Sequence, residues 1–471
     1  MASRRRFGGM PCRGWEIWVN CGGMRLRHSP RSAPLTVLAA AIGVAVAARV
    51  GMAESPVDTA RRAGLRVLES RHLVLVTDRP PRVDDGVDDL PRLFDEAFAS
   101  WCRHAGLDQE THAEWRAFGC LMTDREPFRA AGLLPADGGV PDFANGFCAG
   151  GRFWMVDQSS SDYRRHLLLH EGVHAFMITL RSAAAAPPWY AEGIAEYLAT
   201  HRLATDPEGR ARFVATPIPA RRSDVEQLGR IEQLHALRDA GRAPLLADVF
   251  AQPPQAHATL DAYAASWAAV ALLANHPTHR AAFAAAERGP LDGDFTARLA
   301  AAPGWDAARA NRDFAAFLAD LDYGFDVARS AIDWARGTPL VGRVEIPVAA
   351  DRSWQNAGVA LTQGRRYSFS AAGRVTVGRA SRLPEAAGES RALQATPDGI
   401  TLRWDRGRPI GRLLVAQWID RDDGTSPTFR VLAEGGGGTF TAVADGPVYL
   451  KVNEAPGDLA DNAGEFRVSL E

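Results

Sequence analysis

The pattern of apolar and polar positions changes along the chain, and its first part indicates strands mixed with a helix. Residues 71–78 alternate as a half-buried strand does, and 115–124 and 151–158 show further strand patterns between glycine-rich turns. Residues 86–104 instead carry apolar side chains at helical spacing. We therefore predict a mixed α+β part over residues 65–160.

The periodicity is helical over residues 161–330. Proline turns separate five candidate helices, at 162–181, 190–203, 224–240, 259–275 and 305–322. Beyond this region, short alternating runs with Gly, Asp and Asn turns continue to residue 471, which indicates an all-β sandwich or jelly roll. The predicted fold class is multidomain α+β, with domains at 54–335 and 338–471 and a boundary between residues 330 and 342.

The first 53 residues have the features of a signal peptide. Basic residues precede the apolar run 35–48, and Gly51 and Ala53 fit the small-residue positions of a cleavage site. The run is short for a membrane span, so a signal anchor is the less favoured alternative. Met24 is an alternative true start, because a normal signal peptide opens there. We expect an exported bacterial protein, located in the periplasm or outside the cell.

Charge and cysteine content limit the partners and the redox chemistry. The 54 basic and 56 acidic side chains give a net charge of −2, whereas binding to nucleic acid or a membrane surface requires a basic excess. We expect no nucleic-acid partner, and membrane contact only through the signal segment. Cleavage would leave Cys102, Cys120 and Cys148, and an exported compartment permits one disulfide among them without the sequence deciding which pair.

One apolar run carries three polar side chains at a spacing typical of metal binding. His170, Glu171 and His174 form an H-E-x-x-H pattern within "HLLLHEGVHAFM". Positions four apart lie one above the other on a helix, so both imidazoles can contact one ion. Zinc suits such ligands, and the adjacent glutamate can act as general base toward water. A core helix with satisfied histidines is the alternative, so a third ligand is decisive.

A candidate third ligand follows on the next predicted helix. Glu192 lies in "PPWYAEGIAEY", eighteen positions after His174. Together the two segments resemble the gluzincin zinc metallopeptidases, in which the glutamate of an E-G pair is the third zinc ligand. The resemblance implies a zinc site formed by His170, His174 and Glu192, and hydrolysis of peptide bonds by zinc-activated water with Glu171 as general base.

The same resemblance assigns supporting roles to residues outside the ligand set. Glu196 matches the place where several families keep an acid that hydrogen-bonds a ligand histidine, although a surface acid is an equal alternative. Tyr263 is the candidate for stabilising the oxyanion, with His201 and His257 as alternatives, and a tyrosine simply packed at a helix start is equally compatible. The sequence is similar in particular to a family of exported peptidase-like proteins from planctomycete-type bacteria, over roughly residues 65–325.

The C-terminal part resembles a different family. Residues 371–378 and 452–470 are similar to calcium-dependent galactose-binding lectins with a jelly-roll fold. The resemblance implies carbohydrate as a partner and a calcium site formed by Val377, Glu454, Asp458, Asp461 and Asn462, with carbonyl groups contributed by Val377 and Asp458. Glu454 replaces a shorter aspartate and Asp461 replaces an asparagine. An acidic turn with local hydrogen bonds is the alternative.

The sequence thus predicts an exported zinc metallopeptidase that acts on a peptide or protein and carries a β-sandwich for calcium and carbohydrate. The alternative is a non-catalytic cell-surface or carbohydrate-binding protein with a structural or decayed zinc site. An intact Glu171 argues against decay, because a structural zinc site needs no general base. A third possibility is that the β domain serves only as a packing cap.

Overall fold

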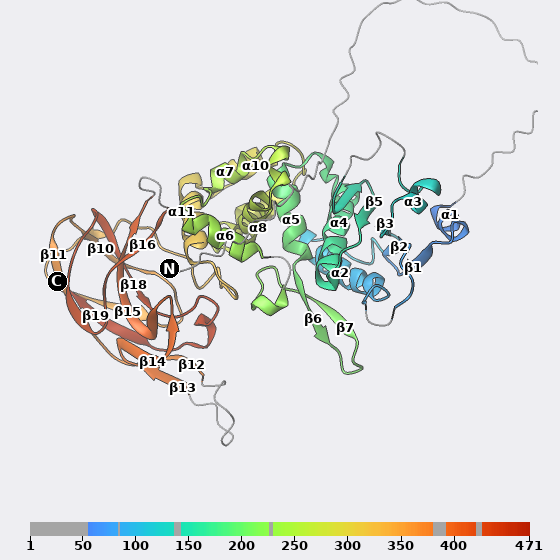
Figure 1. Cartoon of the computed structure of the whole chain (residues 1–471). Helices are drawn as coiled ribbons and strands as arrows, with labels where there is room; N and C mark the ends of the chain where they lie inside the picture. Colours follow the sequence, from blue (N-terminus) through green and yellow to red (C-terminus); the bar gives the residue numbers. More distant parts are fainter. Residues whose placement is uncertain (1–54, 83–84, 136–142, 226–228, 380–391, 421–425) are drawn as a thin grey trace, which may run out of the picture.

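The computed structural model describes residues 55–82, 85–135, 143–225, 229–379, 392–420 and 426–471. The expected signal peptide, its cleavage site and the alternative start at Met24 lie outside the described residues. Within them the protein is mixed α and β, with eleven α-helices and five sheets (Figure 1). The coarse α+β prediction therefore agrees with the structure.

A five-stranded sheet forms the N-terminal end, in the order β1-β2-β3-β5-β4. Its strands are β1 Arg66–Glu69, β2 Leu73–Thr77, β3 Ala117–Met122, β4 Gly146–Ala149 and β5 Arg152–Val156. The central strands β2, β3 and β5 are parallel, and both edge strands are antiparallel to their neighbours. All five residues of β2 are buried, as a parallel strand covered on both faces requires.

Helices cover both faces of this sheet. They are α1 Pro56–Arg62, α2 Leu90–Ala105, α3 Glu126–Ala130 and α4 Ser161–Arg181. Leu73 and Leu75 point into one apolar core with α2 and α4, whereas Val74 and Val76 point into another with α1 and α3. The alternation of side chains along β2 thus separates the two cores.

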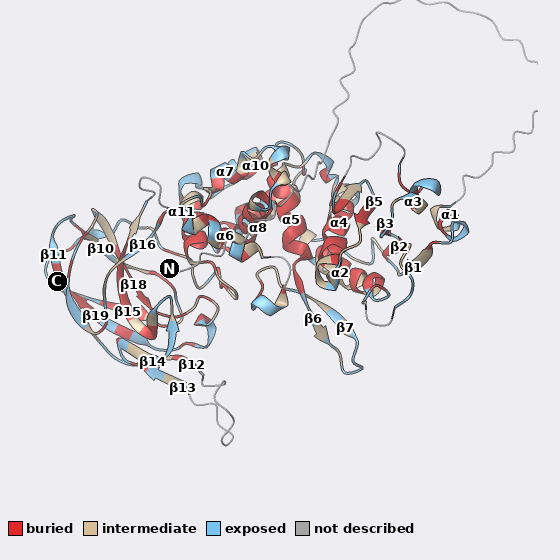
Figure 2. Cartoon of the chain, in the orientation of Figure 1, coloured by how far each residue is buried: buried red, intermediate tan, exposed pale blue. Residues whose placement is uncertain are grey.

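The middle of the chain is helical and packs around one helix that is buried except at its two ends (Figures 1 and 2). Its remaining helices are α5 Pro188–Ala199, α6 Arg230–Asp239, α7 Leu246–Phe250, α8 Leu260–Asn275, α9 Arg280–Arg288, α10 Phe295–Ala300 and α11 Ala307–Asp320. Helix α8 is buried from Ala262 to Leu273 and contacts α5, α6, α7, α9 and α11. Its alanine-rich sequence permits these close approaches, because small side chains leave room for neighbouring helices.

Two predicted helices have different limits in the structure. The helix expected at 190–203 ends at Ala199, where Thr200 turns to an extended backbone. A hairpin follows, formed by β6 His201–Thr205 and β7 Ala211–Ala215. The helix expected at 224–240 begins only at Arg230, after residues that lie partly outside the described chain.

The C-terminal strands form two sheets that share one apolar core, which is a β-sandwich. One sheet has the order β14-β15-β18-β10-β8 with β16 beside β15, and the other has the order β17-β11-β19-β9. The strands are β8 Thr338–Pro339, β9 Val344–Ala349, β10 Gln355–Leu361, β11 Arg366–Ala372, β12 Val375–Arg379, β13 Ala392–Ala395, β14 Asp398–Asp405, β15 Arg408–Ile419, β16 Thr428–Glu434, β17 Gly437–Thr441, β18 Gly446–Val452 and β19 Glu465–Leu470. Strands β12 and β13 pair separately.

The end of α11 contacts the sandwich through a partly buried carboxylate. Asp320 accepts a hydrogen bond from Trp354 Nε1 at 3.0 Å and pairs with the guanidinium of Arg406. Arg406 also donates to the Asp320 carbonyl at 2.9 Å. The helical part and the sandwich are therefore joined by specific polar contacts.

The described residues include no membrane-spanning helix and no disulfide among the three described cysteines. None of the described helices is long and apolar enough to cross a membrane. Cys102, Cys120 and Cys148 are free thiols, so the structure forms no disulfide among these three.

Candidate metal centre

Helix α4 presents the H-E-x-x-H residues from a fixed position. The Ser160 hydroxyl caps the helix by accepting a hydrogen bond from the Tyr163 amide at 3.2 Å. At Gly172 there is no room for a side chain, because a Cβ would lie 2.9 Å from Trp101 Cη2 on α2. Gly172 thus allows α2 to pack closely against α4. This packing orients the polar side chains of α4 toward α5.

The three predicted zinc ligands converge between α4 and α5. The Nε2 atoms of His170 and His174 lie 3.1 Å apart. Glu192 Oε2 lies 3.3 Å from His170 Nε2 and 3.4 Å from His174 Nε2. All three atoms belong to one compact group of ligand atoms.

This triangle fits a tetrahedral zinc ion. Ligand distances of about 2.0–2.2 Å place ligand atoms roughly 3.3–3.6 Å apart in a tetrahedron, close to the separations found here. Glu192 Oε2 is buried and has no hydrogen-bond partner among the described residues, although two imidazoles lie near it. A buried carboxylate oxygen without a hydrogen bond is costly unless a cation binds it. The donor set and its geometry therefore suit zinc.

The carboxylates and imidazoles of the site offset the effect of burial on one another's pKa. Burial alone would lower the pKa of His170, but Glu192 and Glu196 outweigh burial and raise this pKa to about 10. Burial alone would raise the pKa of Glu192, but His174 and His170 outweigh it and lower that pKa.

Glu196 lies one helical turn beyond Glu192 and faces the other side of His170. Its Oε1 lies 3.3 Å from His170 Nδ1, and its Oε2 lies 3.3 Å from His166 Nε2. Arg230 donates to both carboxylate oxygens, at 2.8 and 3.0 Å. Burial alone would raise the pKa of Glu196, but Arg230 and His166 hold it well below its usual range. Glu196 thus lies beside the candidate ligand His170, although His170 Nδ1 makes no hydrogen bond among the described residues.

Glu171 projects from α4 against the edge strand β4. A Cβ on Gly146 would lie 2.8 Å from Glu171 Cδ, so only glycine leaves space for the carboxylate. Burial raises the pKa of Glu171, and His170 and His174 partly oppose this effect. A carboxylate with a raised pKa in a cleft suits a general base.

The candidate metal centre lies in a cleft of about 870 Å³. Tyr263 and His257 both line it, and the Tyr263 ring lies 6.1 Å from the His170 ring. Burial raises the pKa of Tyr263 well above its usual value, so the hydroxyl stays protonated and can donate. His201 is outside the cleft lining, and its Nε2 accepts a hydrogen bond from Arg165 at 2.6 Å. Of the two alternatives to Tyr263, only His257 reaches the cleft.

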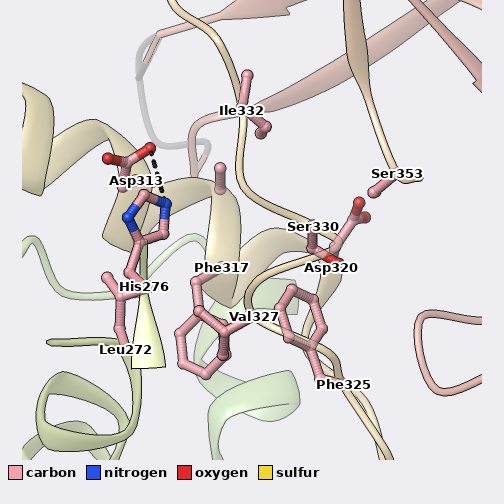
Figure 3. Close-up of a pocket in the computed structure, with 11 residues that line it drawn as sticks. Leu272, His276, Asp313, Phe317, Asp320, Phe325, Val327, Ser330, Ile332 and Ser353 are labelled. Carbon is pink, nitrogen blue, oxygen red and sulfur yellow. Dashed lines mark ion pairs between the residues drawn. The ribbon is translucent and has the colours of Figure 1, made fainter. Parts of the chain in front are cut away.

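A second histidine cluster differs in its hydrogen bonding. Asp313 and His276 line a cavity of about 10 Å³ (Figure 3). His279 belongs to the same group of possible ligand atoms. Both oxygens of Asp313 already pair with N–H groups: Oδ2 with His279 Nε2 at 2.7 Å and Oδ1 with Trp334 Nε1 at 2.7 Å. Arg309 Nε lies 3.5 Å from Oδ2. These donors satisfy the carboxylate, so the cluster is a buried hydrogen-bond network.

The predicted calcium residues gather around Gly378, where an arginine joins them. Arg403 Nη2 lies 2.8 Å from Asp458 Oδ2 and 3.9 Å from Glu454 Oε1. A Cβ on Gly378 would lie 3.3 Å from Arg403 Nη1 and 3.7 Å from Asp461 Oδ2. The Arg403 guanidinium thus lies within ion-pair distance of two of the carboxylates predicted to bind calcium.

The other two predicted calcium ligands, Asn462 and Val377, are held by the backbone and the apolar core around this loop. Asn462 accepts a hydrogen bond from the Gly378 amide at 3.0 Å and donates to the Ala350 carbonyl at 3.1 Å. Val377, the neighbour of Gly378, is fully buried in the sandwich core. Glu454 Oε2 is buried without a hydrogen-bond partner among the described residues, which leaves one oxygen for a cation.

Sequence reasoning missed Arg230 and His166. His166 precedes His170 by four positions, so a row of three histidines at helical spacing was visible in the sequence. Arg230 carried no such signal, because it reaches the site from a helix 34 positions away in sequence from Glu196.

No family model and no curated protein matches the chain. Among solved structures, the chain is similar to the N-terminal domain of EclA, described as a PllA-like lectin, at 22% sequence identity. The match covers 27% of this chain and 92% of that chain, with a TM-score of 0.19. A TM-score this low does not establish a shared fold.

Proposed function

We propose that the protein is an exported zinc-dependent metallopeptidase of the gluzincin type. The observation that supports this most directly is the triangle of His170 Nε2, His174 Nε2 and Glu192 Oε2, with separations of 3.1, 3.3 and 3.4 Å. The carboxylate of Glu171 lies beside it in the cleft. A structural zinc site needs neither an open cleft nor an adjacent base.

The cleft suits an extended peptide. Its lining includes α4 from Tyr163 to Ile178, which corresponds to roughly 22 Å of helix. An extended chain rises about 3.3 Å per residue, so roughly six or seven residues fit this length. Strand β4 is an edge strand that pairs only with β5 among the described strands, and its residues also line the cleft. Its free backbone groups can align a peptide by adding a strand.

The residues of the chain then have distinct tasks. His170, His174 and Glu192 would hold zinc, which when bound polarises water and the substrate carbonyl. Glu171 accepts a proton from water and returns it to the leaving nitrogen. Tyr263 donates a hydrogen bond to the carbonyl oxygen as negative charge develops there. Calcium and carbohydrate binding by the sandwich remain predictions from the sequence.

Two variants test the assignment against a non-catalytic zinc protein. Zinc content and peptide hydrolysis are measured for the wild type, Glu171→Gln and His170→Ala. We expect about one zinc per wild-type chain, zinc without turnover in Glu171→Gln, and loss of both in His170→Ala. Hydrolysis retained by Glu171→Gln, or a zinc-loaded wild type without activity on casein or a peptide library, would refute the proposal.

A further inference from the structure

The carboxylate of Glu196 is the most heavily bonded acid near the candidate metal centre. It is 3% exposed and faces three basic side chains from two helices, namely Arg230 of α6 and His166 and His170 of α4. Only Arg230 makes hydrogen bonds of good geometry to it, at 2.8 and 3.0 Å to the two oxygens. Both ring nitrogens of His166 lack a hydrogen-bond partner among the described residues. Arg230 therefore fixes the plane of the carboxylate.

The same carboxylate is the group placed to orient His170, whose Nδ1 is buried and has no hydrogen-bond partner among the described residues. Glu196 Oε1 receives Arg230 Nη2 and also faces His170 Nδ1 at 3.3 Å. The opposite ring nitrogen, His170 Nε2, belongs to the ligand triangle. A partner that accepts from one imidazole nitrogen selects the tautomer with a free lone pair on the other. Rotation of the Glu196 carboxylate would thus misalign the ligand atom.

The guanidinium is itself held in place by the cleft wall. Its Cζ lies 5.4 Å from the centre of the Tyr263 ring, and the arginine side chain is 12% exposed. An arginine presents two parallel N–H groups to a carboxylate while its flat face stacks on an aromatic ring, and lysine cannot do both. The ring of Tyr263, rather than its hydroxyl, provides this support.

We propose that Arg230 is a positioning residue for the candidate metal centre. Arg230 holds the Glu196 carboxylate in one orientation and thereby aligns His170 for metal binding. This inference rests on the proposed zinc site and assigns to α6 a part in forming it. Arg230 contacts no ligand atom of the triangle, so its effect must pass through Glu196. That dependence makes the idea testable by a double-mutant cycle.

The experiment measures zinc affinity of the full chain by competition with a chelating dye, and the absorption spectrum of the cobalt-substituted protein. The variants are Arg230→Met, Arg230→Lys, Glu196→Gln and the double variant Arg230→Met/Glu196→Gln. We expect each single variant to weaken zinc binding about 10- to 100-fold, as loss of such outer partners typically does. The double variant should lose no more than the weaker-binding single variant. Arg230→Lys should resemble Arg230→Met and alter the cobalt spectrum.

A control variant separates this role from general damage. Arg238→Met lies on the same helix and removes contacts with Asp239 and the Ala319 carbonyl, so zinc affinity should be unchanged. If Arg230→Met does not fold, Arg230→Lys replaces it in the double-mutant cycle with Glu196→Gln, and the same non-additive loss of affinity is expected.

Additive losses in the double variant, or wild-type affinity in both Arg230 variants, would overturn the role of Arg230. Absence of zinc binding by the wild type would instead refute the proposed function. The readout is metal binding, so it does not depend on finding a peptide substrate.

Discussion

The backbone of Gly193 on α5 lies directly against the carbonyl of Ser266 on α8. A Cβ at Gly193 would be 2.5 Å from Ser266 O and 2.8 Å from Val270 Cγ2. This contact joins the helix that carries Glu192 to the helix that carries Tyr263. The glycine of the E-G pair therefore sets how closely the candidate metal ligand and the candidate oxyanion donor approach each other.

Gly193→Ala should destabilise the protein by about 1–3 kcal/mol, because the added methyl group meets the backbone of a buried helix. Urea unfolding measures the change. Gly293→Ala is the matched control, since a Cβ there has no neighbour within 4 Å. An unchanged free energy of unfolding in Gly193→Ala would contradict the close contact between α5 and α8.

Tyr263→Phe should lower kcat for peptide hydrolysis by about 100- to 1,000-fold, with little change in KM. Loss of one donor to a developing oxyanion typically has an effect of this size. Tyr323→Phe serves as the control and should leave kcat unchanged, because Tyr323 does not line the cleft. Its hydroxyl donates a hydrogen bond to Glu232 at 2.7 Å. A fall in kcat of less than threefold in Tyr263→Phe would exclude the hydroxyl from catalysis.

His276 should make the protein less stable as the pH falls. Burial lowers its pKa from 6.5 to about 4, and the attraction of Asp313 only partly opposes this. Between these pH values the unfolded chain binds the proton more readily than the folded chain. The contribution of neutral His276 to the free energy of unfolding is therefore complete above pH 6.5 and is lost as the pH falls through 4. Unfolding free energies at pH 7 and pH 4.5 measure the effect.

His276→Asn isolates the contribution of this histidine. The asparagine oxygen can replace His276 Nδ1 as the acceptor for the Thr278 amide, a contact of 3.2 Å. The variant should lose less stability than the wild type over the same pH interval. An identical loss in both proteins would mean that His276 does not contribute.

Arg403→Gln should increase the affinity of the Glu454 loop for calcium by at least about tenfold, because it removes a positive charge within ion-pair distance of two carboxylates. Calorimetric titration of calcium-free protein measures the affinity. Arg412→Gln, whose arginine pairs with Glu434 instead, is the control. Equal calcium affinity in Arg403→Gln and the wild type would contradict competition between arginine and calcium.

Local periodicity was sufficient to predict several elements. The helix predicted at 162–181 is confirmed as Ser161–Arg181, and the one at 259–275 as Leu260–Asn275. Both are long and carry apolar residues at helical spacing, so the helical repeat is clear in the sequence. The segment after Ala199 was wrongly assigned to a helix, because the hairpin that replaces it is stabilised by strand pairing at a distance.

The sequence by itself determined which residues could form the candidate site. The spacing of His170 and His174 places them on one helical face, because 3.6 residues per turn is a property of the backbone itself. What brings Glu192 to within 3.4 Å of both imidazoles is the packing of α5 against α4 and α8. Arg230 at Glu196 and Arg403 at Glu454 likewise depend on tertiary structure. Contacts between distant segments arise when separate elements pack together, and no local spacing encodes them.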